Sequence, residues 1–309
     1  MDVLALQQLL PARVKFALKP YYRKVFPNKL HIYWNPTFRC NYRCSYCPVV
    51  TKFAFTTVVG KSGERSGADW LEAFDRLPPA AFYIAGGEPF VYADLPTVLN
   101  DLPLKHRLLG IVTNLSQPAS VYRKIKKRLH LNASFHREHT SDDDFIAKIR
   151  ELRDSFHIHV NIVATPQNLP LLTKIAEEFS GCDIPLHVDP FVQKGFQYTP
   201  RQLELLQPFL APDRKPKTQL DFNDFHPKQC SAGRNYINLS PDGSAYTCNG
   251  GMNFVHSTLY SEWSSGRDVS KYRMGNIFDP NFQVNQKDMI CSMPCNMACD
   301  RDTASIRPM

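Results

Sequence analysis

The feature that most restricts the fold of this chain is a regular alternation of short apolar runs with amphipathic segments between residues 30 and 210. This alternation predicts repeated strand–helix units and therefore a parallel sheet. The expected strands are 30–36, 81–85, 107–113, 129–135, 157–164 and 184–192, and the expected helices are 69–77, 92–102, 120–128, 142–156, 169–179 and 200–210. Six such units predict an α/β protein whose core is an open, partial (β/α)6 TIM-like barrel.

Three cysteines stand close together directly after the first expected strand. Cys40, Cys44 and Cys47 have the spacing C-x3-C-x2-C, and the next cysteine is Cys182. One short loop with this spacing can hold a four-iron cluster by three thiolates, which leaves one iron without a protein ligand. An open metal position is typical of catalytic sites. The alternatives are three structural thiols or a zinc site, which would need further ligands from far along the chain.

A second motif, Gly86-Gly87-Glu88-Pro89, follows the second expected strand. Functional loops of barrels lie at the carboxyl ends of the strands. Two glycines allow a ligand to approach the backbone closely, and Glu88 can accept hydrogen bonds from an ammonium group. The alternative is an ordinary turn.

Together, the two motifs resemble the radical S-adenosylmethionine (SAM) superfamily, including an aromatic residue, Tyr46, just before the last cysteine. The resemblance implies a partial barrel and a 4Fe–4S cluster on the three cysteines. It also implies that SAM chelates the free iron and is cleaved reductively to a 5′-deoxyadenosyl radical. Gly86, Gly87 and Glu88 would then bind the methionyl amine of SAM.

Polar residues at the ends of two further strands extend this candidate site. Thr113 and Asn114 end the third expected strand, and Ser134 and His136 end the fourth. By the resemblance, these residues contact the ribose, the carboxylate or the sulfonium side of SAM; strand-end caps are the alternative. For His187, in the sixth expected strand, the favoured interpretation is a buried core histidine.

The last third of the chain carries five further cysteines: Cys230, Cys248, Cys291, Cys295 and Cys299. Ser-Pro-Asp-Gly at 240–243 predicts a β-hairpin with strands 235–239 and 244–247. The open end of this hairpin would bring Cys230 and Cys248 together. The segment resembles the SPASM/twitch extensions of radical SAM enzymes, which hold auxiliary clusters.

Five cysteines are enough for one auxiliary 4Fe–4S cluster, with one cysteine left over. The tail has the spacing C-x3-C-x3-C, which does not indicate whether Cys291, Cys295 or Cys299 is the extra one. A structural zinc site with four cysteines is the alternative.

These features divide the 309 residues into four expected parts. They are a basic N-terminal helical extension (1–29), the radical SAM core (30–211), a linker (212–229) and the auxiliary-cluster domain (230–309). No acidic residue occurs between Asp2 and Glu64, and the extension is interpreted as a helix that caps the barrel rather than one that contacts a membrane surface. No apolar run is long enough to span a bilayer, and no secretory signal is expected.

The expected function is a radical SAM oxidation, a dehydrogenation assisted by the auxiliary cluster. Alternatives are a SPASM-type peptide maturase and a viperin-like nucleotide dehydratase, although the latter lacks a five-cysteine tail. The expected partners are a small-molecule or peptide substrate and an external electron donor of the flavodoxin or ferredoxin type, with no nucleic acid. Clustered cysteines also favour metal ligation in a reducing cytoplasm.

Overall fold

The computed structural model describes residues 30–47, 63–191, 196–210, 227–256, 266, 268–292 and 306–308. The expected N-terminal extension, most of the expected linker, Cys295 and Cys299 lie outside the described residues.

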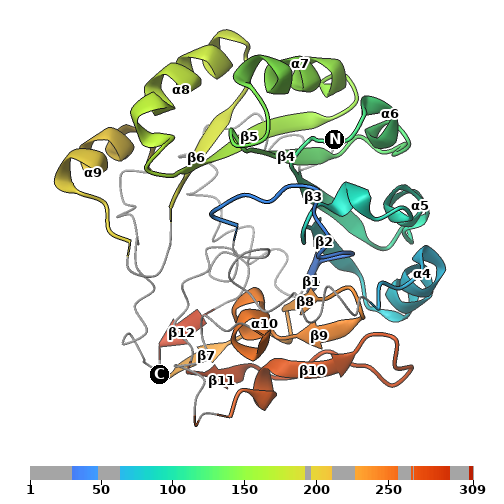
Figure 1. Cartoon of the computed structure of the whole chain (residues 1–309). Coiled ribbons are helices and arrows are strands. Elements are labelled where there is room, and N and C mark those ends of the chain that lie inside the picture. Colours follow the sequence, from blue (N-terminus) through green and yellow to red (C-terminus); the bar gives the residue numbers. More distant parts are fainter. Residues whose placement is uncertain are drawn as a thin grey trace, which may run out of the picture.

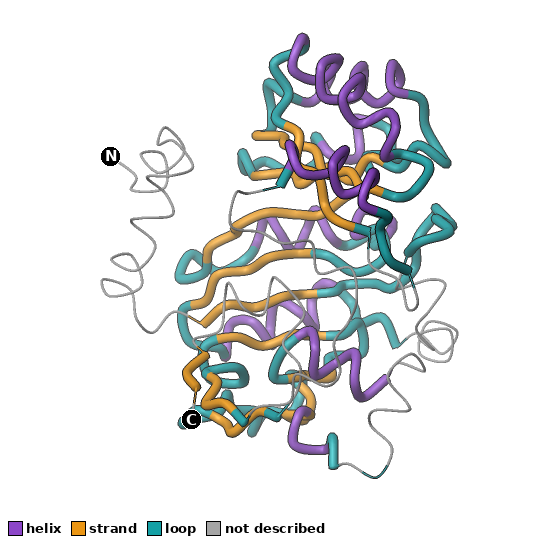
Figure 2. The backbone as a smooth tube through the Cα atoms, turned by 90° about the vertical axis from the view of Figure 1, so that its left-hand side faces the viewer, coloured by secondary structure: helices purple, strands orange, loops and turns teal. Residues whose placement is uncertain are grey.

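Nine strands form one curved sheet in the order β10-β9-β8-β1-β2-β3-β4-β5-β6 (Figure 1). Six of its strands form the partial barrel and run parallel to one another: β1 (Leu30–Trp34), β2 (Ala80–Ile84), β3 (Arg107–Thr113), β4 (His130–Phe135), β5 (His157–Ala164) and β6 (Leu186–Pro190). Each of these strands pairs with the next one in sequence, and β6 forms an edge of the sheet, so the barrel is open. Figure 2, turned by 90°, shows the strands side by side along the molecule.

Helices cover the convex side of this sheet (Figure 1). They are α4 (Gly67–Arg76), α5 (Leu95–Asp101), α6 (Ala119–Tyr122), α7 (Asp142–Leu152), α8 (Leu172–Gly181) and α9 (Pro200–Leu206), with the 3-10 turns η2 (Pro89–Val91), η3 (Leu169–Leu171) and η4 (Gln207–Phe209). The core lies between the two layers; the ring of Trp34 on β1, for example, is 5.2 Å from those of Trp70 and Phe74 on α4. No helix among the described residues is both long and apolar enough to cross a membrane.

The fold-class prediction is confirmed: the chain is mixed α/β, with a partial-barrel parallel sheet and a small C-terminal antiparallel sheet. The bounds of β3 and β5 are the expected ones. The expected helix 120–128 is much shorter, because α6 ends at Tyr122. Farther on, the backbone N–H of Lys126 donates to Oδ1 of Asn100 (2.8 Å) instead of to a helical carbonyl.

The expected hairpin is present as β8 (Tyr236–Leu239) and β9 (Ser244–Tyr246), which pair antiparallel. Gly243 closes the turn with a φ of +83°, and its N–H donates to the Ser240 carbonyl (2.9 Å). Strand β8 pairs in parallel with β1, and β10 (Arg273–Asn276) adds to β9. The predicted boundary between core and C-terminal domain stays a prediction, but the sheet continues across it.

The remaining C-terminal elements surround the hairpin. Strands β7 (Lys228–Cys230), β11 (Met289–Cys291) and β12 (Ile306–Pro308) form the small antiparallel sheet, with β7 in the centre. Helix α10 (Asn249–His256) directly follows Cys248, and the 3-10 turn η6 (Ser270–Tyr272) leads into β10.

Candidate active site

The loop that leaves β1 carries Cys40, Cys44 and Cys47. The backbone N–H of Tyr42 donates to the Cys40 sulfur (3.4 Å), and that of Cys47 donates to the Cys44 carbonyl (3.1 Å). Burial, and after it the neighbouring Cys47, Glu138 and Cys40, raise the pKa of the Cys44 thiol to about 12. Iron bound here must displace these thiol protons, because thiolates are the form that ligates metal. Three thiols that influence one another electrostatically on one short loop fit a three-cysteine cluster.

The two glycines of the second motif fix this loop against the end of β2. The N–H of Gly87 donates to the Thr37 carbonyl (2.9 Å), and the N–H of Glu88 donates to the Arg39 carbonyl (2.8 Å). Gly86 has a φ of +123°, and a Cβ there would lie 2.2 Å from the Thr37 oxygen; at Gly87 it would lie 2.1 Å from the Arg39 oxygen. The close approach that these glycines allow is therefore made by the chain itself, just before the cysteines.

Glu88 is buried, with 1% of its surface exposed. Its Oε1 accepts hydrogen bonds from the Thr113 hydroxyl (2.8 Å) and the Phe90 N–H (3.1 Å), and its Oε2 accepts one from the Asn114 N–H (2.6 Å). Burial raises its pKa to about 7, while these three donors act to lower it. The carboxylate thus ties the end of β2 to the end of β3. Its contact with an ammonium group stays a prediction.

The raised pKa of Glu88 predicts a pH-dependent stability. The folded pKa (about 7) lies above the ordinary value of 4.5, so the contribution of this group is full below pH 4.5 and lost as the pH rises to about 7. Relative to Glu88→Gln, the wild-type free energy of unfolding should fall by up to about 3 kcal/mol over this range. Urea unfolding of the metal-free proteins at pH 4.5–8 measures the difference. Glu72→Gln, at an exposed position, serves as the control. If the difference in free energy of unfolding between wild type and Glu88→Gln did not change with pH, the raised pKa of Glu88 would be contradicted.

Asn114 connects this group to the cysteine loop. Its side-chain Nδ2 donates to the Asn41 oxygen Oδ1 (3.1 Å) and lies 3.8 Å from the Cys40 sulfur, within hydrogen-bonding range of sulfur. The structure therefore brings Glu88, Thr113 and Asn114 together beside the first cysteine; their contact with SAM stays a prediction.

The loop after β4 holds the other side of the cysteine loop. His136 Nδ1 is 2.7 Å from the Tyr46 hydroxyl, and burial, followed by the neighbouring His139, lowers its pKa to about 4, so its ring is neutral at pH 7. Glu138 accepts hydrogen bonds from the N–H (2.8 Å) and hydroxyl (2.5 Å) of Ser45. His136 therefore lies against the cysteine loop, and its contact with SAM stays a prediction.

Sequence reasoning missed Glu138 and His139. The N–H of Arg43 donates to His139 Nε2 (3.3 Å), and the His139 ring stacks on Tyr42 at 4.2 Å. One ligand atom each of Cys44, Glu138 and His139 lie within 4.8 Å of one another. The only signal in the sequence is that both residues continue the polar run after His136, at the end of an expected strand.

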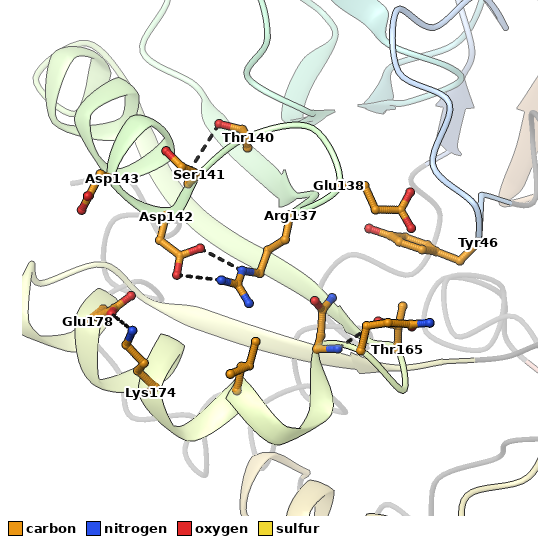
Figure 3. A pocket seen from close by; sticks show the side chains of 13 residues that line it. Tyr46, Arg137, Glu138, Thr140, Ser141, Asp142, Asp143, Thr165, Lys174 and Glu178 are labelled. Carbon is orange, nitrogen blue, oxygen red and sulfur yellow. Dashed lines mark hydrogen bonds and ion pairs between the residues drawn. The ribbon is translucent and has the colours of Figure 1, made fainter.

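A polar pocket of about 640 Å3 opens beside Tyr46, at the carboxyl ends of β4 and β5 (Figure 3). Arg137 lies in this pocket and forms an ion pair with Asp142 at the start of α7 (Nε–Oδ1 2.9 Å). Thr165 and Asn168, which follow β5, also line the pocket. The pocket therefore has room for a polar ligand next to the cysteine loop.

The concave side of β4 to β6 is polar. Leu131, Ala133 and Phe135 of β4 belong to the hydrophobic core, so Asn132 and Ser134 lie on the opposite, concave face. The strand registers align Ser134 with Asn161 and Asn161 with His187. Ser134 therefore lies in the wall of the barrel, and none of the cysteine-loop contacts above involves it.

The interpretation of His187 as a buried core histidine is wrong. Its side chain is 48% exposed, and its Nε2 lies 3.3 Å from Oδ1 of Asp189 on the same face of β6. Val188, between them, fills the core position instead. Alternation along the strand thus places His187 on the concave face.

A second group of cysteines gathers in the C-terminal part. Cys230 on β7, Cys248 before α10 and Cys291 on β11 are all buried, with 6–7% exposed. In the β7–β11 ladder, Cys230 pairs with Met289 and Cys291 pairs with Lys228, so the two cysteines are diagonal neighbours on one face. The three thiols come from three separate segments of the chain. A cluster bound to them would therefore join these segments.

The surroundings of Cys248 also fit a metal cluster. Its sulfur accepts a hydrogen bond from the Gly251 N–H (3.1 Å) at the start of α10, where backbone donors stabilise a thiolate. The neighbouring Thr247 hydroxyl is buried and has no hydrogen-bond partner among the described residues. A Cβ at Gly251 would lie 3.0 Å from the Thr247 hydroxyl oxygen and 3.6 Å from the Cys248 sulfur, so a side chain there would crowd the surroundings of the thiol. The Thr247 hydroxyl could donate to a sulfur atom of an iron–sulfur cluster bound beside Cys248, so its lack of a partner fits such a cluster.

The three-cysteine loop and the bonded strand ends around it define a candidate iron–sulfur site at the mouth of a partial barrel. Residues 34–169 match the family model described as the Radical SAM superfamily. The match begins in β1 and ends in η3, so it includes the cysteine loop and the Gly-Gly-Glu-Pro motif. This part of the chain is a radical SAM domain. No curated protein matches the chain at a significant level.

Solved radical SAM structures share the fold at low sequence identity. SuiB of Streptococcus suis, bound to S-adenosylmethionine, is 14% identical with a TM-score of 0.52, over 82% of this chain and 68% of that one. The same protein bound to its precursor peptide SuiA is 14% identical with a TM-score of 0.50, over 77% and 63%. A tagged anSMEcpe with bound AdoMet is 15% identical with a TM-score of 0.50, over 81% and 75%.

Proposed function

We propose that this protein cleaves SAM reductively and uses the resulting 5′-deoxyadenosyl radical to take a hydrogen atom from a small-molecule substrate, in a dehydrogenation assisted by an auxiliary 4Fe–4S cluster. The observation that carries the oxidation is the second group of buried cysteines, Cys230, Cys248 and Cys291, in a chain that also has the three-cysteine loop. Only the first group is needed for SAM cleavage, so the second suits a reaction that must also remove an electron from the substrate.

Cys40, Cys44 and Cys47 would hold the first cluster, which supplies the electron for SAM cleavage when it is bound. The bonds from Glu138, His139 and Asn114 fix the loop in the fold. These contacts place the three thiols before iron arrives, which lowers the cost of ordering the loop.

SAM would lie across the strand ends next to this loop. Because the Glu88 carboxylate is already bonded to three internal donors, we assign the methionyl ammonium to the backbone carbonyls of Gly86 and Gly87, with Glu88 adding its nearby charge. Thr113, Asn114, Ser134 and His136 would surround the rest of the methionyl and ribose parts. The pocket beside Tyr46 has the volume and the polar lining to take the adenosyl part.

The concave face of the sheet supports a hydroxylated or aminated small substrate. Tyr83, Asn132, Ser134, Asn161, His187 and Asp189 offer hydroxyl, amide, imidazole and carboxylate groups on this face. None of these six side chains is a lysine or arginine, the residues that recognise phosphate most often. An alcohol or amine would find both donors and acceptors there.

A peptide substrate is the second candidate, supported by the shared fold with SuiB, a protein that has been crystallised with a precursor peptide. A SPASM-type maturase would leave a cross-link, a thioether or an inverted centre in a peptide. A short peptide gene beside the gene for this protein would favour this reaction, whereas a sugar or aminoglycoside gene cluster would favour dehydrogenation.

The central test is anaerobic incubation of the reconstituted protein with SAM and dithionite, followed by mass spectrometry of the products. We expect 5′-deoxyadenosine and methionine in equal amounts. The same products should form when a flavodoxin or ferredoxin replaces dithionite as the electron donor. Protein without iron is the control. Absence of 5′-deoxyadenosine from protein that carries its iron would contradict the proposed function.

A further inference from the structure

Two side chains of the loop after β4 lie next to the middle cysteine of the three-cysteine loop. One ligand atom each of Cys44, Glu138 and His139 lie within 4.8 Å of one another. Exposed carboxylates alone are common on protein surfaces, but this group also offers a thiol and an imidazole. Thiolate, imidazole and carboxylate are the ligands that proteins use for zinc and for similar divalent transition metals. Three protein ligands leave a further position open, so an ion bound there would stay accessible to other ligands.

Neighbouring groups already hold the carboxylate and the imidazole in position. Glu138 accepts hydrogen bonds from the N–H (2.8 Å) and the hydroxyl (2.5 Å) of Ser45. His139 Nε2 accepts one from the Arg43 N–H (3.3 Å), and the ring stacks on Tyr42 at 4.2 Å. Such outer contacts orient the ligands of metal sites in proteins. A carboxylate oxygen that accepts one hydrogen bond keeps a lone pair for a metal, and the bond to His139 is longer than the usual range, so a metal can replace it.

The group is open to solvent through two of its members. Glu138 and His139 are exposed, whereas Cys44 is buried, with 4% of its surface exposed. An incoming ion would therefore meet the carboxylate and the imidazole before the thiol. Cys44 would release its proton to the solvent on binding, because the thiolate is the form that ligates metal. One thiolate and one carboxylate balance the charge of a divalent ion, and a neutral imidazole adds none.

We propose that Cys44, Glu138 and His139 bind one divalent transition-metal ion in the metal-free protein, Fe²⁺ in the cell, and that this entry site is where iron first reaches the three-cysteine loop. The inference rests on the proposed function only in that this loop is to hold a cluster. Cys44 belongs to both sites, whereas Glu138 and His139 belong to the entry site alone. Zinc should compete with iron here, because Zn²⁺ binds a given site with such ligands more tightly than Fe²⁺ does.

The first test is the binding of Co²⁺ to the metal-free full chain without oxygen, measured by the thiolate-to-cobalt absorption. Replacing Cys40 and Cys47 with Ala removes the cluster site and keeps Cys44. In this background, Cys44→Ala should remove one Co²⁺ per chain, and Glu138→Gln or His139→Gln should weaken the binding of that ion at least about tenfold. The second group of cysteines also offers thiolates to Co²⁺, but it is the same in every variant, so the differences belong to the loop.

Two matched controls replace similar side chains elsewhere in the chain. Glu72 is an exposed carboxylate on α4, and His157, at the start of β5, stacks on the His130 ring at 5.0 Å. Glu72→Gln and His157→Gln should leave the Co²⁺ affinity unchanged. His139→Cys exchanges one metal ligand for another and removes the ring that stacks on Tyr42. It should therefore retain Co²⁺ binding, which a purely structural role of the ring does not predict.

A second measurement follows cluster loading with the three cysteines intact. When iron and sulfide are supplied without oxygen, Glu138→Gln and His139→Gln should load the first cluster several-fold more slowly than the wild type and reach the same final iron content. Circular dichroism of the metal-free variants checks that they are folded.

Unchanged Co²⁺ affinity in folded Glu138→Gln and His139→Gln, or loss of Co²⁺ binding in folded His139→Cys, would overturn the entry site. Either result would leave the proposed function standing, because SAM cleavage needs only the three thiolates and their cluster. Conversely, iron-loaded wild type that forms no 5′-deoxyadenosine would contradict the proposed function, while the Co²⁺ measurements would still support the entry site if they show the expected differences.

Discussion

Replacing Cys40, Cys44 and Cys47 with Ala should lower the iron content of the anaerobically reconstituted protein from about eight to about four atoms per chain. It should also abolish 5′-deoxyadenosine formation, because SAM would no longer meet a cluster. The three thiols lie on one loop and influence one another electrostatically, so their loss removes one complete site. Iron analysis and the mass-spectrometric assay on the same sample measure both effects.

The matched control is Cys182→Ala. Cys182 directly follows α8, and its sulfur accepts a hydrogen bond from the Arg150 guanidinium (3.0 Å), so its surroundings are those of a structural thiol. This variant should keep about eight irons. If the unsubstituted protein instead holds about four irons together with one zinc, the second group is a zinc site.

A Cys230→Ala/Cys248→Ala variant should separate the two cluster sites. It should still form 5′-deoxyadenosine from SAM, since the first site is intact, but it should no longer convert the substrate. The reason is that the electron left on the substrate would have no acceptor within the protein. Product analysis and 5′-deoxyadenosine analysis of the same reaction measure the two steps separately.

Stability is the confounding factor in this variant, because a bound metal that joins β7, α10 and β11 also stabilises the fold. Circular dichroism of the same sample must therefore show the wild-type helix content. Wild-type product formation by the folded variant would mean that the second site is structural and that the oxidative mechanism is incorrect.

The sequence predicts the barrel well because each of its strands is marked locally. Strand β3 is largely apolar, and β5 alternates polar with apolar residues along most of its length; the bounds of both agree with the prediction. The hairpin is marked by its turn, in which Gly243 adopts a left-handed conformation. By contrast, nothing local in Tyr236–Leu239 indicates that β8 will pair with β1, because that choice depends on which sheet edge remains uncovered.

The candidate site was predictable in its residue types but not in its contacts. Glu88 is conspicuous in its motif, yet two of the three donors to its carboxylate, Thr113 and Asn114, come from the next strand. Spacing identifies groups that can do chemistry, whereas the distances between them depend on the tertiary fold.

The place of β1 in the sheet has a consequence for how the chain matures. His31 pairs with Ala81 on one side and with Tyr236 on the other. During synthesis the second side of β1 therefore remains an uncovered strand edge until most of the polypeptide has left the ribosome. Such distant pairing slows folding and leaves an edge open to aggregation. The strand that leads into the cysteine loop thus gains its second neighbour late, so the sheet should complete its folding only after residues 236–239 have left the ribosome.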